Sequence, residues 1–242
     1  ASARRALDVQ RARVSTAERA LGAEHRYTLD ALGDLASTLS LLGRQGEEEA
    51  LARRRLEASE RTLGAEHPCT LVALGSLAKT LCRTGRQDEA EPLMRRRLEA
   101  SERALGREHP STLAALGNLA RVLSEMGRPA EAELLERRRL EASDRTLGSE
   151  HPSTLRALRG LAATLSALGR RAEAEPLMRW ALEDSERALG AGHAATLAAL
   201  GGLAETLCEL GRHCEAEPLM RRAARAFERT RGAEHPDTLR AL

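Results

Sequence analysis

The chain has 242 residues, of which 42% are hydrophobic and 31% are charged, and 38 Lys and Arg nearly balance 36 Asp and Glu, for a formal net charge of +2. This balance argues against nucleic acid as a partner, and aromatic residues, at 1%, are too scarce to stack bases. No apolar run approaches the roughly 18 residues that span a bilayer, so we expect no membrane insertion. Four scattered cysteines favour a reducing compartment, the cytoplasm.

In chain order, residues 1–22 match the second half of a repeating unit and end in a motif that recurs along the chain. The motif reads LGREHPSTL at 105–113, and its copies follow one another at 42-residue intervals. Such a constant period indicates one supersecondary unit stacked on copies of itself. The other copies lie at 21–29, 63–71, 147–155, 189–197 and 231–239.

Each interval between two motifs predicts two helices. In the second unit, one apolar stripe at helical spacing follows Pro68, and a second stripe precedes Gly106. The stripes are Leu71, Leu74, Leu77, Ala78 and Leu81, then Ala90, Leu93, Met94, Leu98 and Leu105. Gly85 and Gly106 are predicted to end these helices in the left-handed conformation.

The motif histidine is predicted to cap the helix that follows it. A metal site is disfavoured, because helices of successive units lie about 8–10 Å apart, whereas ligands must all approach one ion to about 2 Å. Cys208, His213 and Cys214 are close in sequence but lack a fourth ligand, so we interpret the cysteines as packing residues.

These patterns predict an all-α fold in which antiparallel helix hairpins stack into a right-handed superhelical solenoid. We expect the second (B) helix of a preceding repeat, five complete repeats and the start of a further one. In that order the ranges are 1–22, 26–64, 68–106, 110–148, 152–190, 194–232 and 236–242. Because neither end shows a polar capping unit, the chain is interpreted as a fragment of a longer array.

Charged residues of the second helices are interpreted as a solvated face. Arginine runs at 53–55, 95–97 and 137–139 have glutamates beside them, which favours ion pairs over a nucleic-acid patch. We expect pairs four residues apart, such as Glu57 with Arg61.

Two kinds of departure break the repeat. Glu48 stands where the other units have alanine, and Arg55, Arg97 and Arg139 stand where Ala181 and Ala223 supply a small residue. Those arginines either extend along their helix or pair with a carboxylate of the next unit.

Catalytic motifs are missing from the sequence. It has no glycine-rich phosphate loop, no Ser/His/Asp set and no paired-carboxylate motif, so we predict no enzyme activity and no cofactor.

The unit resembles the tetratricopeptide repeat, in the 42-residue form found in kinesin light chains, and nephrocystin-like arrays are similar. The string that carries the resemblance is Leu74-x-x-Leu77-Ala78-x-x-Leu81-x-x-x-Gly85-x-x-x-Glu89-Ala90-Glu91-Pro92-Leu93, then Leu98, then Leu105-Gly106-x-x-His109-Pro110. The resemblance implies a non-enzymatic scaffold for protein–protein interaction, with the first (A) helices lining a concave groove. The alternatives are the sensor or oligomerisation array of a signalling NTPase, or a structural subunit of a larger assembly.

The resemblance also implies which residues face a bound peptide. Groove-side positions are basic in the middle units and acidic toward both ends of the chain, which favours an acidic peptide or protein as the partner. The alternative is that these charges only keep the face soluble. The candidate residues are Lys79, Arg83, Asn118, Arg121, Arg156 and Arg159, with Asn118 expected to bond the peptide backbone.

Overall fold

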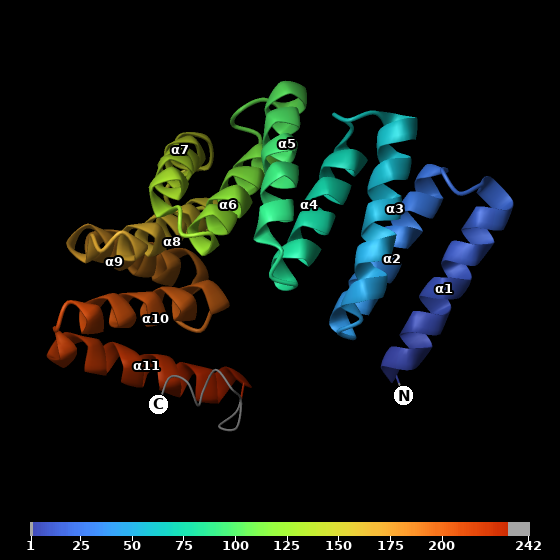
Figure 1. The fold of residues 1–242 in the computed structure, drawn as a ribbon. Helices are drawn as coiled ribbons and strands as arrows, with labels where there is room; N and C mark the ends of the chain where they lie inside the picture. Colours follow the sequence, from blue (N-terminus) through green and yellow to red (C-terminus); the bar gives the residue numbers. More distant parts are fainter. Residues whose placement is uncertain (1, 232–242) are drawn as a thin grey trace. The chain divides into compact units, whose positions relative to one another are not determined.

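The computed structural model describes residues 2–231, and every regular element within them is an α-helix (Figure 1). This confirms the all-α prediction. The helices are α1 (Ser2–Leu21), α2 (Arg26–Leu41), α3 (Gln45–Leu63), α4 (Pro68–Arg83), α5 (Gln87–Leu105), α6 (Pro110–Glu125), α7 (Pro129–Leu147), α8 (Pro152–Ala167), α9 (Arg171–Leu189), α10 (Ala194–Glu209) and α11 (His213–Arg231). The expected start of a further repeat, 236–242, lies outside the described residues.

Helices that follow one another in the chain run antiparallel (Figure 1). We call α2, α4, α6, α8 and α10 the A helices, and α1, α3, α5, α7, α9 and α11 the B helices. The chain divides into two compact units, Ala1–Val122 and Leu123–Leu242, and each is described by itself. The first holds α1 to α5 and most of α6, and the second holds α7 to α11. The right-handed superhelix stays a prediction.

Leucines of the A helices form the core of each unit. Leu74 in the first unit and Leu158 in the second have no exposed surface, as the apolar stripes predict. In the first unit the leucines of α2 pack with Leu7 and Val14 of α1 and with Ala58 of α3. Burying one such side chain stabilises the fold by about 1.5–3 kcal/mol. Because the buried residues come from neighbouring helices, each hairpin gains part of this stabilisation from the hairpins beside it.

The recurring motif joins a B helix to the next A helix through several hydrogen bonds. In its second copy, the Nδ1 atom of His67 accepts a bond from the backbone N–H of Cys69 at 3.1 Å, which confirms the predicted cap. The hydroxyl of Thr70, fully buried, donates to the carbonyl of Gly64 at 2.7 Å. Gly64 itself has a φ of +87°, which a residue with a Cβ rarely adopts. The cap recurs at His25, His109, His151 and His193.

The motif glutamate makes an ion pair that the sequence analysis did not anticipate. Glu66 accepts a bond from Arg103 of the next hairpin at 2.7 Å, and Glu24 pairs in the same way with Arg61. The expected pairing of Glu57 with Arg61 is therefore wrong. Stacking places the motif loop of one hairpin beside the last turn of the following B helix, and the loop glutamate reaches the arginine first.

One carboxyl is buried between two hairpins of the second unit. Glu136 of α7 is 4% exposed and occupies the repeat position of Met94 and Met178. A Cβ atom built on Gly160 of α8 would lie 2.6 Å from its Oε1, so a larger residue there would require the carboxyl of Glu136 to move. Burial raises the pKa of Glu136 to about 6, against the opposing effect of Arg139 at 3.2 Å.

Removing one histidine cap should weaken the fold. His67→Ala leaves an N–H of the first turn of α4 without its acceptor, which should lower the free energy of unfolding by about 1 kcal/mol. His67→Asn, which keeps an acceptor, should retain most of it. Urea denaturation measures both. His213→Ala, at a histidine without this bond in the described chain, is the control, and equal losses at His67 and His213 would contradict the capping role.

The buried carboxyl predicts a pH dependence. Because the folded pKa of about 6 exceeds the ordinary 4.5, the native state holds this proton more tightly than the unfolded chain. Relative to a Glu136→Gln variant, the free energy of unfolding should therefore be highest below pH 4.5 and fall by about 2 kcal/mol as the pH rises past about 6. Urea titrations at several pH values test this, with Glu141→Gln, an exposed site on α7, as the control. A pH-independent difference would contradict it.

Candidate functional site

The first unit contains a polar cavity of about 330 Å³, lined by the A helices α2 and α4 and by the B helix α3. We call it the α2–α4 pocket. Glycine and alanine form part of its wall, which keeps it open. Its functional groups are the cations of Arg55, Lys79 and Arg83, the carboxylate of Glu48 and the hydroxyls of Ser37, Ser40, Ser76 and Thr80.

Arg55 reaches the pocket from α3 and packs against the backbone of α2. A Cβ atom on Gly33 would lie 2.7 Å from its Nη1, so the glycine makes room for the guanidinium. The side chain is 11% exposed, and its ion pair with Asp30, at 3.7 Å, is too long for a hydrogen bond. Its buried Nε has no acceptor. Because an unsatisfied buried donor costs about 1–3 kcal/mol, Arg55 retains unused capacity to bind an acceptor.

Glu48 neutralises a different cation of the same pocket. It is 7% exposed, and its Oε1 accepts a bond of 2.8 Å from the hydroxyl of Thr80. Its Oε2 pairs with Arg83, which also donates to Ser40. A buried carboxylate is stable only when paired and hydrogen-bonded, and here both conditions are met. The charge of Arg83 is therefore compensated within the protein.

Lys79 is the third cation of the pocket, and it is exposed on α4. Within the described chain it forms neither an ion pair nor a hydrogen bond. Elsewhere on the first unit, arginines of the B helices pair with glutamates of adjacent hairpins, such as Arg54 with Glu18 at 2.6 Å and Arg96 with Glu60 at 2.7 Å. Uncompensated positive charge thus remains at Lys79 and in part at Arg55.

The six residues expected from the sequence fall in both units. Lys79, Arg83, Asn118 and Arg121 belong to the first, and the pocket brings only Lys79 and Arg83 together. Asn118 is half-buried and Arg121 exposed on α6, at the repeat positions of two residues of the pocket rim, Ser76 and Lys79.

The other two expected residues belong to α8 of the second unit. Arg156 is exposed, and its guanidinium donates to the hydroxyl of Ser153 at 3.4 Å. Arg159 is half-buried. Burial, and secondarily the positive charge of Arg156, lower the pKa of Arg159.

Two of the arginines that stand where other repeats have alanine, Arg55 and Arg97, fit because the paired A helix carries a glycine opposite each of them. Arg97 packs against Gly75 as Arg55 does against Gly33, with a Cβ on Gly75 also 2.7 Å from Nη1. In the fourth repeat the sizes are exchanged: Arg159 takes the position of the glycines, and Ala181 that of the arginines. A glycine on the paired A helix makes the space for Arg55 and for Arg97, and Arg139 pairs with Glu136 of its own helix at 3.2 Å.

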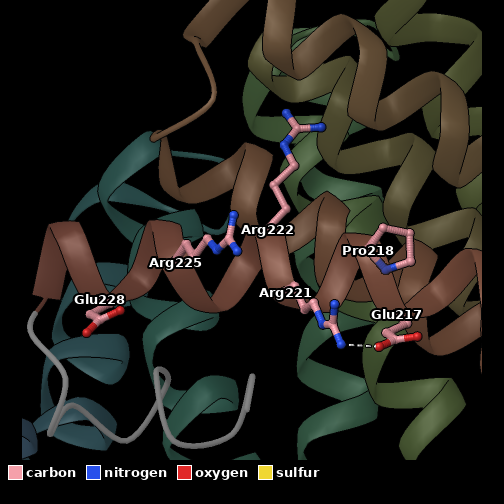
Figure 2. Close-up of a pocket in the computed structure, with 6 residues that line it drawn as sticks. All are labelled: Glu217, Pro218, Arg221, Arg222, Arg225 and Glu228. Atoms are coloured by element: carbon pink, nitrogen blue, oxygen red, sulfur yellow. Dashed lines mark ion pairs between the residues drawn. The ribbon is translucent and has the colours of Figure 1, made fainter.

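A larger cavity of about 770 Å³ lies on α11 (Figure 2). Its lining residues all belong to that one helix, and Arg221 is already paired with Glu217 at 2.5 Å. Arg222 pairs with Glu186 of α9. With a single helix for a wall and two cations compensated, this cavity is a weaker candidate than the α2–α4 pocket.

Residues 2–231 hold no group of three or more His, Cys, Asp and Glu side chains arranged to bind a metal ion. Cys208 and Cys214 are free thiols. Of the helices described, none has both the length and the apolar character needed to cross a membrane.

Comparison with known proteins identifies the repeat. Models of the tetratricopeptide repeat match residues 93–145, 137–187 and 195–242, and a second model of the same repeat matches residues 28–68 and 70–111. No curated protein sequence matches the chain.

Solved structures are similar over most of the chain. A candidate kinesin light chain from Podosopora anserina, built of nearly identical TPR-like repeats, is 29% identical, with a TM-score of 0.74 over 86% of this chain and 99% of that one. BtubC (BKLC) from P. vanneervenii is 20% identical, with a TM-score of 0.81 over 98% and 94% of the two chains. YrrB, a TPR protein with an unusual peptide-binding site, is 16% identical, with a TM-score of 0.53 over 94% and 96%. The chain therefore belongs to the tetratricopeptide repeat family and is similar to the members of kinesin-light-chain type.

Proposed function

We propose that this chain is a protein-interaction scaffold whose A helices bind an extended acidic peptide or an acidic segment of a partner protein. The observation that carries the proposal is the α2–α4 pocket, where Lys79 keeps its charge uncompensated beside a row of hydroxyl groups. Cations that the fold does not use can attract an anionic partner and hydrogen-bond to it.

The charge distribution over the A helices supports the same partner. Arg121 stands at the repeat position of Lys79 on the next A helix, and Arg156 adds an exposed cation on α8. Toward the chain ends two of the A-helix acids are already paired: Asp34 with Arg13 at 2.5 Å and Glu209 with Arg171 at 2.6 Å.

The fold itself is compatible with this role. Tetratricopeptide repeats form scaffolds for protein interaction, and YrrB carries a peptide-binding site on a related arrangement of helices. Asn118, half-buried on α6, has an amide that can both donate to and accept from a peptide backbone. We assign it that role in the proposed site.

The proposal predicts that two arginines control acidic-peptide binding. In the Arg121→Ala/Arg159→Ala double variant, affinity for an acidic peptide selected from a library should fall at least about tenfold, because each charge-assisted bond is worth about 1.5–3 kcal/mol. The salt dependence of binding should also become weaker. Fluorescence polarisation at several salt concentrations measures both quantities.

The matched control removes two arginines from the B helices. Arg61→Ala/Arg103→Ala changes the net charge equally but should leave affinity within about twofold, since surface substitutions away from a site have small effects. If the library selects neutral or basic peptides, or if the two double variants lose affinity equally, the proposed function is wrong.

A further inference from the structure

We propose that the α2–α4 pocket receives one carboxylate side chain of the bound peptide, held by the guanidinium of Arg55 and the ammonium of Lys79. The inference rests on the proposed function and deepens it. Arg55 is on a B helix and was not among the residues expected to touch a ligand, whereas Arg83, which was, becomes part of the protein's own framework.

The cations of the pocket outnumber its acid. Three cations line it, and Glu48 is the acid among its lining residues. Glu48 is committed to Arg83 and Thr80, so its charge compensates Arg83 and leaves the other two cations. An anion that enters the pocket therefore meets positive charge from Lys79 and, in part, from Arg55, whose ion pair with Asp30 is 3.7 Å long.

The guanidinium of Arg55 lacks a full set of hydrogen-bond acceptors within the protein. Its guanidinium has five N–H donors in a rigid fork that matches a carboxylate. Asp30 lies 3.7 Å from Nη2, beyond hydrogen-bond distance, and the buried Nε has no acceptor. The guanidinium occupies the space that Gly33 leaves against α2, and the side chain is 11% exposed. A carboxylate would supply the acceptors that the protein does not provide.

The size and the lining of the α2–α4 pocket suit a single carboxylate side chain. A cavity of about 330 Å³ accommodates one Asp or Glu side chain with a few waters, but not a folded element. Hydroxyls of Ser37 and Ser76 line the same cavity; each donates its proton to a backbone carbonyl of its own helix, so its oxygen can accept a bond from Lys79 or from a water that bridges to the carboxylate. Lys79, exposed on α4, can close over the bound group.

Two variants move affinity in opposite directions. Arg55→Ala places there the residue found at Ala181 and Ala223, and it should weaken binding of a fluorescein-labelled tetraglutamate peptide about tenfold, because a charge-assisted bond is lost. Glu48→Ala places there the alanine of the other repeats and releases Arg83 as a third cation, so it should strengthen binding several-fold. The Glu48→Ala/Arg83→Ala variant removes a neutral pair and should bind within about twofold of the original chain.

Free glutarate tests the pocket without the rest of the groove. In ¹H–¹⁵N NMR of the whole chain, glutarate should shift the Nε–H signal of Arg55 saturably, and Lys79→Ala should reduce that affinity. Arg55→Lys, which keeps the charge but not the fork, should bind less tightly than the original chain. It also provides a test if Arg55→Ala fails to fold.

The outcomes separate this inference from the proposed function. If selected acidic peptides bind but Arg55→Ala has no effect and glutarate leaves the Arg55 signal unmoved, the subsite is wrong and the scaffold function stands. If glutarate shifts Arg55 while no acidic peptide binds, the pocket stands and the proposed function fails. If inorganic phosphate shifts Arg55 at lower concentration than glutarate does, the carboxylate assignment is overturned.

Discussion

The hydrogen-bonded junction between a B helix and the next A helix is the constraint on which the fold depends. At this junction the chain reverses within four residues, and four residues stabilise the reversal. Gly64 takes the left-handed turn, Thr70 bonds its carbonyl, His67 caps α4 and Glu66 reaches the following hairpin. Because this junction recurs between successive hairpins, with Gly192 in place of the glutamate before α10, a change in loop length would move both stripes of the next hairpin off the core. The unbroken 42-residue period follows from this requirement.

A second constraint acts where A and B helices approach each other closely. At several of these contacts a large side chain of one helix lies where the other helix carries glycine. Gly33 admits Arg55, Gly160 admits Glu136 and Gly202 admits Met178. Substituting either member alone would produce overlap or a void, both of which destabilise a packed interior. This rule accounts for the exchange of sizes between repeats better than helix propensity does, since glycine is a poor helix former at any of these sites.

The structural features that recur in every repeat could be predicted from the sequence, whereas the roles of residues that depart from the repeat could not. Helix type, the glycine terminations and the histidine caps recur in every unit, so each prediction had several independent supports. The functions of Glu48 and Arg55 depend on which side chains of neighbouring helices approach them, and the stripe of a single helix carries no such information. Glycine opposite an arginine, read across two helices of one hairpin, was a visible pattern that helical periodicity alone does not use.

Charge pairing links these packing rules to binding. Arginines on the B helices are joined to glutamates of adjacent hairpins, as Arg54 is to Glu18 at 2.6 Å, and such pairs align one hairpin with the next. Each exposed pair contributes little stability, but it leaves its arginine unable to attract a ligand. Lys79 has no such pair, and the fold holds Arg55 in place without giving it a full set of acceptors. A surface that is nearly neutral as a whole can therefore present a small positive site, formed by the cations that the framework leaves unpaired.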